Sequence, residues 1–168
     1  MNPQIKLTHG AKKLVRGKKN DSGLDLQVKG FSRIRNSKIV DTVWFEDVED
    51  KFVTIYPNET TLLKTGVQIS LPKKGDSLYT IEAQIRSRSG LSLKSGTRVT
   101  TGTIDNGYQG DYGINFKNEG LMPYRVNDGD RVAQVVFNVV LIPDVIDYVT
   151  EFGETSDRGE GGFGHTGL

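Results

Sequence analysis

The 168-residue chain has the length of about one domain. Its 22 lysine and arginine residues nearly balance 21 acidic residues, so a net charge of +1 gives no overall field that would attract nucleic acid or an acidic membrane surface. The absence of cysteine and the presence of only two histidines exclude disulfides, thiolate catalysis and Cys-rich or His-rich metal sites, so any bound metal must be held through oxygen. No apolar run is long enough to span a bilayer and the N-terminus lacks a signal-peptide pattern; we therefore expect a cytoplasmic protein with no membrane partner.

Apolar and polar residues alternate in several short segments, which predicts β-strands with one solvated face. These segments cover residues 67–71, 79–86 and 112–117. Residues 132–142 are instead almost continuously apolar and rich in Val and Ile, which is typical of a strand covered on both faces. We expect this strand at the centre of the core.

Turn signals separate the predicted strands. Asn106-Gly107 suits a tight turn with positive φ and predicts a hairpin over residues 101–116. Residues 91–95, with Ser89 as a candidate N-cap, predict one short helical turn. Many short strands with almost no helix indicate an all-β sandwich, jelly roll or barrel.

Residues 31–58 fit this pattern poorly. They carry several basic residues, then Trp44 and Phe45, then an acidic run over residues 46–50. We expect an inserted hairpin or excursion within a single β domain that covers residues 1–156. If Trp44 and Phe45 are exposed, the insertion offers a docking surface for an unknown protein partner.

The C-terminal segment, residues 157–168, is rich in glycine and has Phe163 as its only large apolar residue. Composition favours a disordered terminus, because glycine buries no side chain and loses the most backbone entropy on folding. The alternative is a phosphate-binding arm. Arg158, the closely spaced glycines and Thr166 supply the charge, the close backbone approach and the hydroxyl that phosphate oxygens need.

Four further places in the chain carry groups suited to chemistry. Residues 86–90 supply two guanidiniums and two hydroxyls, which either hold a polyphosphate or form a solvated strand end. Asp105 is either a general base or a turn residue, and Asp25 is equally ambiguous. Gln134 lies within an apolar run, so its amide must find a partner, and a ligand is one candidate.

Five segments, taken in order, resemble the five motifs of the trimeric dUTP pyrophosphatases, the dUTPase family. They are Ser22-Gly23-Leu24-Asp25-Leu26, Arg88-Ser89-Gly90-Leu91, residues 102–111 (GTIDNGYQGD), residues 129–134 (GDRVAQ) and residues 158–167 (RGEGGFGHTG). The resemblance implies a jelly-roll or distorted β-barrel subunit that assembles as a homotrimer. It also implies three active sites, each built from more than one chain and closed by the C-terminal arm, that hydrolyse dUTP to dUMP and pyrophosphate.

The same resemblance assigns roles to single residues. Asp105 resembles the base that activates a water for in-line attack on the α-phosphorus. Tyr108 resembles the aromatic that packs under the deoxyribose and excludes a 2′-hydroxyl, while the backbone around Gly102 and Ile104 reads uracil.

The remaining roles concern phosphates and metal. The positions that match phosphate-binding residues are Arg88, Ser89, Gly90 and Gln134. In the arm, the corresponding positions are Arg158 for the γ-phosphate, Phe163 over the uracil ring, and Gly164 and Thr166 in the phosphate cradle. Asp25 matches the residue that hydrogen-bonds metal-bound water. Mg²⁺ suits this chemistry independently, because it retains waters and is bound mainly by substrate oxygens.

Three features depart from the family pattern. His165 replaces a small hydroxyl residue, Val99 lies where some members carry a uracil-facing Asn, and residues 31–58 lengthen the spacing between Asp25 and Arg88. Two other functions stay open. One is a dCTP deaminase-like enzyme on the same fold, and the other is a non-catalytic nucleotide-binding regulatory protein.

Overall fold

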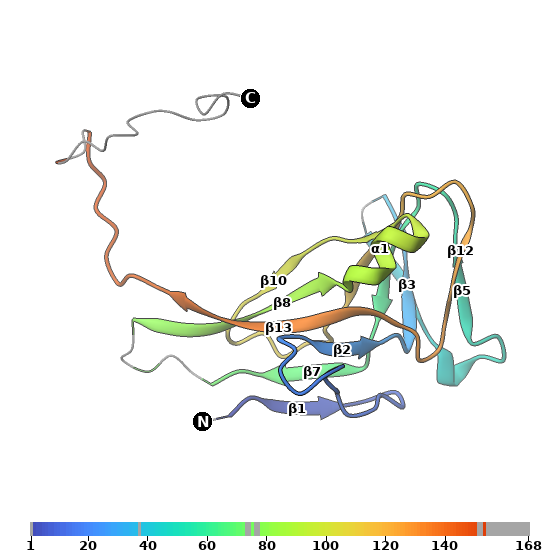
Figure 1. Ribbon diagram of the computed structural model, residues 1–168, viewed down its shortest axis with the longest axis horizontal. Helices are drawn as coiled ribbons and strands as arrows, with labels where there is room; N and C mark the ends of the chain where they lie inside the picture. The colour runs from blue at the N-terminus through green and yellow to red at the C-terminus, as the bar shows by residue number, and fades with distance from the viewer. Residues whose placement is uncertain (1, 37, 73–74, 76–77, 151–152, 154–168) are drawn as a thin grey trace.

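The computed structural model describes residues 2–36, 38–72, 75, 78–150 and 153 (Figure 1). Regular structure in these residues is almost entirely β, with a single α-helix, α1 (Ser89–Ser95), and one 3-10 turn, η1 (Phe45–Asp47). The predicted all-β class and the predicted helical turn are both confirmed. Within this part of the chain no helix is long and apolar enough to cross a membrane. The strands are β1 (Gln4–Leu7), β2 (Leu24–Gln27), β3 (Gly30–Arg35), β4 (Lys38–Trp44), β5 (Phe52–Ile55), β6 (Thr60–Lys64), β7 (Val67–Ser70), β8 (Tyr79–Ser87), β9 (Thr97–Val99), β10 (Gly102–Ile104), β11 (Ile114–Asn118), β12 (Tyr124–Asn127) and β13 (Arg131–Leu141).

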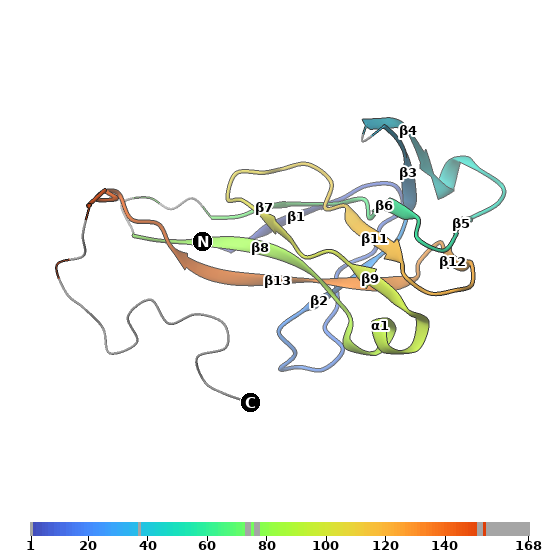
Figure 2. The ribbon, with the colours of Figure 1, turned by 90° about the horizontal axis from the view of Figure 1, so that it is seen from above.

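The strands form four antiparallel sheets around one core (Figure 2). One larger sheet has the order β10-β8-β13-β2 and the other the order β4-β3-β6-β11-β9, while β1 pairs with β7 and β12 with β5. All four sheets contribute side chains to a single buried apolar cluster, which includes Leu26, Ile55, Leu63, Ile69, Phe116, Val126 and Val135. Burial of this cluster is the main source of the fold's stability.

Strand β13 lies between β2 and β8, as expected of a central strand. Its first half is buried, but the prediction that the whole run is covered on both faces is wrong. Val139 is 72% and Leu141 58% exposed. The outer half of β13 pairs with β8 alone, and the two strands extend together beyond the rest of the β domain (Figure 1).

The predicted turn at Asn106-Gly107 is confirmed, but the predicted hairpin over residues 101–116 is wrong. The Tyr108 amide donates to the Asp105 carbonyl at 3.1 Å, and Gly107 has φ of 109°, as a type II turn requires. However, β10 pairs with β8, while β11 pairs with β6 and β9. The loop between them is tied to other segments, since the Asn106 amide donates to the Pro72 carbonyl at 2.6 Å, and the two strands diverge into different sheets.

The segment over residues 31–58 contains the predicted hairpin, formed by β3 and β4. The expectation that Trp44 and Phe45 are exposed is wrong. Phe45 is fully buried in the core, and Trp44 is partly buried and stacks on His9 with ring centroids 3.6 Å apart. Because β3 also pairs with β6 and β5 pairs with β12, much of this segment is part of the packed domain.

We predict that Phe45→Ala destabilises the protein by about 3–5 kcal/mol, because it leaves a cavity where a complete ring was buried. The matched control is Val40→Ala on β4, whose side chain is more than half exposed. Urea denaturation at a fixed protein concentration measures both. Equal midpoints for the two variants would show that Phe45 does not anchor the segment.

Candidate active site

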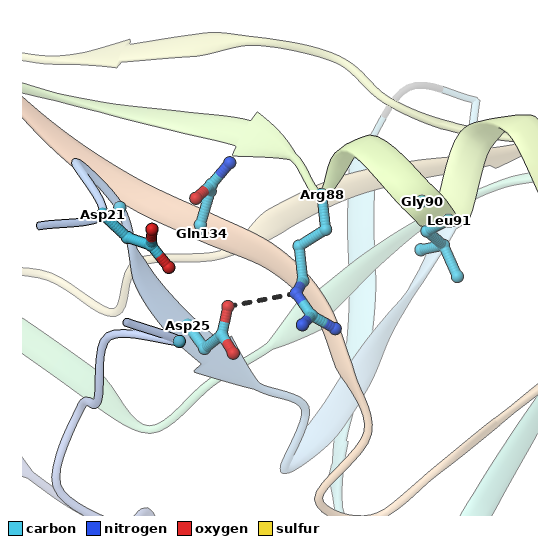
Figure 3. Close-up of a pocket in the computed structure, with 8 residues that line it drawn as sticks. Asp21, Asp25, Arg88, Gly90, Leu91 and Gln134 are labelled. Carbon is cyan, nitrogen blue, oxygen red and sulfur yellow. Dashed lines mark ion pairs between the residues drawn. The ribbon is translucent and has the colours of Figure 1, made fainter. Parts of the chain in front are cut away.

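A cavity of about 370 Å³ lies where β2, β13 and the start of α1 meet (Figure 3). We call it the arginine pocket; it is lined by Gly17, Asp21, Gly23, Asp25, Arg88, Gly90, Leu91 and Gln134. The strand register assembles it, since Gln134 on β13 pairs with Asp25 on β2 on one side and with Arg86 on β8 on the other. Arg88 follows directly after β8, so it reaches the same pocket.

A buried carboxylate organises the charges at this pocket. Asp25 is only 8% exposed; its Oδ1 lies 3.0 Å from Arg88 Nε and its Oδ2 lies 3.3 Å from Arg131 Nη1. Arg88 also donates from Nη1 to the Arg131 carbonyl at 3.0 Å. The two guanidiniums are partly exposed, so one buried carboxylate holds two cations at the surface, where they can donate hydrogen bonds to an anion.

The amide of Gln134 has found a protein partner, as its position in an apolar strand required. Its Nε2 donates to the Ser87 carbonyl at 3.2 Å. A Cβ atom at residue 23 would collide with the Gln134 side chain, so the close approach of the two segments requires Gly23. The sequence Ser22-Gly23-Leu24-Asp25 therefore fits closely against β13.

A second cavity, of about 410 Å³, contains Asp105 and Tyr108. We call it the tyrosine pocket; it is lined by Ile39, Leu62, Lys64, Ile85, Thr100, Gly102, Thr103, Ile104, Asp105, Tyr108, Asp111, Gly113 and Asn115. The Asp105 side chain is exposed at this cavity, and the half-exposed Tyr108 donates its hydroxyl to the Asp111 carbonyl at 3.2 Å.

Asp111 anchors the loop that carries Asp105 and Tyr108. Its Oδ1 lies 3.0 Å from Lys64 Nζ, and its Oδ2 accepts the Gly66 amide at 2.7 Å. The Asp111 carboxylate therefore has a structural role, because both of its oxygens already contact protein groups. Asp105 is therefore the carboxylate of this pocket that is available for chemistry.

The family model of the dUTPases matches residues 48–167. The chain belongs to the dUTPase family. Curated relatives include the deoxyuridine 5'-triphosphate nucleotidohydrolases of Clostridium novyi, 46% identical over 118 residues, and of Heliobacterium modesticaldum, 35% identical over 177 residues. The alignments cover 69% of this chain and 78% of the first relative, and 100% and 98% for the second.

Solved dUTPase structures share the fold. The dUTPase of Staphylococcus bacteriophage 80alpha with dUPNHPP is 29% identical, covers 99% of each chain and has a TM-score of 0.76. A mutant dUTPase of phage phi11 of S. aureus, described with a coordinated structural Mg(II) ion, is 26% identical, covers 92% of this chain and 100% of that chain, and has a TM-score of 0.69. These likenesses confirm the jelly-roll fold that the sequence motifs of the dUTPases implied.

The structure divides the residues expected from the dUTPase motifs between the two cavities. The arginine pocket collects Asp25, Arg88, Gly90 and Gln134, and the tyrosine pocket collects Gly102, Ile104, Asp105 and Tyr108. Ser89 begins α1. The expected arm residues Arg158, Phe163, Gly164 and Thr166 lie outside the described residues.

Sequence reasoning assigned no role to Arg131, Asp21 or Lys64. The sequence did contain a signal for Arg131. This residue begins β13 and lies in the same short segment, residues 129–134, as Gln134. Its pairing with Asp25 spans 106 residues and only the fold reveals it.

Metal binding at these pockets would depend on a bound phosphate compound to supply most of the oxygen ligands. Among the described residues no group of three or more His, Asp or Glu side chains converges on one point. Both oxygens of Asp25 already face guanidiniums, while Asp21 lies at the same cavity with an exposed side chain. This donor set fits a hydrated Mg²⁺ that is bound mainly by phosphate oxygens.

Tyr112 lies beneath Tyr108, with ring centroids 6.1 Å apart. It is fully buried, and its hydroxyl has no hydrogen-bond partner among the described residues. Burial, and secondarily the neighbouring Tyr108, raises the pKa of Tyr112 to about 12. The neutral phenol is therefore the form that the fold stabilises.

We predict that this phenol makes folding sensitive to alkali. Its folded pKa lies above the unfolded value near 10, so its contribution is complete below pH 10 and is lost as pH rises toward 12, by about 2–3 kcal/mol. In Tyr112→Phe we expect unchanged or greater stability at pH 7 and a smaller loss between pH 10 and 12. Denaturation midpoints across this range test it, and parallel losses in both proteins would contradict it.

Proposed function

We propose that this protein hydrolyses dUTP to dUMP and pyrophosphate. The observation that carries the proposal is the pair of guanidiniums held by the buried Asp25 beside Gly90 and Gln134, an anion site in a chain of the dUTPase family. The names of the curated relatives and the dUPNHPP held by the 80alpha enzyme support the choice of substrate.

In this proposal the arginine pocket binds the triphosphate. Arg88 and Arg131 would donate charge-assisted hydrogen bonds to phosphate oxygens, and Ser89, Gly90 and Gln134 would complete the contacts. Asp25 fixes both guanidiniums before the ligand arrives, which reduces the entropy lost on binding. Arg158, Gly164 and Thr166 of the arm would contact the same phosphates, and Phe163 would cover the base.

The chemical step is assigned to Asp105. Its carboxylate takes a proton from a water as the water oxygen bonds to the α-phosphorus, and the bond from this phosphorus to the bridging oxygen breaks to release pyrophosphate. Tyr108 would pack under the deoxyribose and leave no space for a 2′-hydroxyl. The backbone of Gly102 and Ile104 would read the uracil.

Mg²⁺ bound to the triphosphate would neutralise phosphate charge and so assist attack by water. Asp25 is proposed to accept a hydrogen bond from a water on the metal. Asp21, exposed at the same cavity, is placed to do the same. Neither residue would be needed as a direct ligand, because Mg²⁺ typically keeps several waters and is bound by substrate phosphates.

Separation of the two cavities supports a homotrimer whose active sites combine the arginine pocket of one chain with the tyrosine pocket of another. The outer half of β13 provides a further argument for association. Val139 and Leu141 on β13, and Ile142 directly after it, are exposed apolar residues on the part of the chain that extends from the domain, and such a surface favours contact with another chain.

A nucleotide panel tests the substrate. The purified protein is incubated with dUTP, dCTP, dTTP and UTP, each with and without Mg²⁺, and pyrophosphate and ammonia are measured. We expect pyrophosphate from dUTP with Mg²⁺ and no ammonia from dCTP. Ammonia from dCTP would replace this proposal by the deaminase, and no product from any nucleotide would favour a binding protein.

We predict that Asp105→Asn lowers kcat for dUTP by about 10²–10⁴-fold, the usual contribution of a general base, and leaves binding of a non-hydrolysable analogue within a few fold. Asp111→Asn is the matched control, because that carboxylate lies at the same cavity but pairs with Lys64. It should lower thermal stability more than the Asp105 variant does. Turnover by Asp105→Asn near the wild-type rate would reduce Asp105 to a turn residue.

A further inference from the structure

We propose that the β3–β4 hairpin forms one wall of the tyrosine pocket and that Ile39 on β4 contacts the nucleoside part of the substrate. This inference rests on the proposed function and adds a substrate-contacting residue to it. Ile39 lines the same cavity as Asp105 and Tyr108, although it lies 66 residues before Asp105 in the chain. Figure 2 shows the hairpin beside β6, the strand that contributes Leu62 and Lys64 to this cavity.

The pairing of β3 with β6 defines which face of the hairpin meets the pocket. Gly30 pairs with Lys64 and Ser32 pairs with Leu62, and both β6 residues line the cavity. Side chains alternate along a strand, so Ile34 continues the face of Gly30 and Ser32.

A bulge on β4 then brings Ile39 to this face. Arg33 pairs with Asp41, but the next residue, Ile34, pairs with Ile39, so Val40 is an extra residue without a partner. In a regular ladder Ile34 would pair with Val40, and Ile39 would lie on the opposite face. A bulge that redirects a side chain next to an active site is a common device of β-sheets.

Cross-strand contacts hold the hairpin in this position. The hydroxyls of Ser32 and Thr42 are hydrogen-bonded at 2.8 Å, and Arg33 Nη1 lies 3.3 Å from Asp41 Oδ2. At its base, Trp44 stacks on His9. The hairpin is therefore an integral part of the five-stranded sheet and can support a ligand contact.

The charges around Ile39 favour an uncharged part of the ligand. Lys64 and Asp111 neutralise one another at 3.0 Å, which leaves Asp105 as the remaining charge among the lining residues. Such a cavity repels phosphates and suits a sugar or base. The family model begins at residue 48, so Ile39 lies outside the part of the chain that the model matches.

Two alanine variants isolate the contact. Ile39 is 57% and Val40 54% exposed, so neither change should disturb the core, and Val40 does not line the cavity. We expect Ile39→Ala to raise KM for dUTP by about 3–10-fold with kcat within about twofold, as loss of an apolar contact from a pocket predicts. Val40→Ala should match the wild type in KM, kcat and melting temperature.

Inhibition constants for deoxyuridine and pyrophosphate show which part of the substrate the Ile39→Ala change affects. Deoxyuridine should bind the Ile39→Ala variant more weakly by the same factor as dUTP, whereas pyrophosphate, which would use the arginine pocket, should bind unchanged. Deletion of Val40 removes the bulge and should reproduce the Ile39→Ala result if the hairpin still folds.

The outcomes separate the two claims. A wild-type protein that does not hydrolyse dUTP overturns the proposed function. A wild-type protein that hydrolyses dUTP, with identical KM and deoxyuridine inhibition in the Ile39→Ala and Val40→Ala variants, overturns the role of Ile39 and leaves the function intact. A shift that affects pyrophosphate as strongly as deoxyuridine would also contradict a nucleoside contact.

Discussion

The assembly of the arginine pocket depends on the register of β13. This strand pairs with β8 from Ala133 to Leu141 and with β2 on its other side, so Gln134 lies in one row with Asp25 and Arg86. Ala133 and Val135 are fully buried, and a slip of one residue would move the polar Gln134 to the face on which they lie, so core packing favours the observed register. Core packing thus determines the geometry of the arginine pocket.

The two cavities divide the substrate's chemistry between them. The arginine pocket presents guanidiniums that a buried carboxylate holds in place, which suits an anion. The tyrosine pocket presents Ile39, Ile104 and Tyr108 around one available carboxylate, which suits an uncharged ring next to a water to be activated. A nucleoside triphosphate combines both characters, and the two cavities share no lining residue, which supports the proposal that a second chain completes each site.

Local sequence patterns predicted β7, β8, β11, β13 and the helical turn because alternation and turn residues act over a few positions. The partners of Asn106 include Pro72 and those of Asp111 include Gly66, so the divergence of β10 and β11 depends on contacts with distant parts of the chain. A local turn signal at Asn106-Gly107 cannot contain that information, which explains the wrong hairpin.

The residues around the insertion were less predictable for the same reason. The composition of residues 31–58 indicated an inserted hairpin or excursion, whereas Phe45 enters a core formed by distant strands and Trp44 stacks on His9. Ile39 faces the tyrosine pocket through one unpaired residue, Val40, and a bulge has no signature in the alternation of a single strand. The five dUTPase-like motifs, by contrast, identified the family from residue types and their order along the chain, without any knowledge of their contacts.

The most direct test of a site shared between chains is subunit complementation. Arg88→Ala and Asp105→Asn each disable one pocket, so each variant alone should be nearly inactive on dUTP. When the two are mixed, unfolded and refolded together, random assembly should restore about a quarter of the wild-type sites, because each site takes one pocket from each of two chains. Recovery near that level would support the account. A mixture that forms the same oligomer but is no more active than the separate variants would contradict it, because both pockets of each site would then belong to one chain.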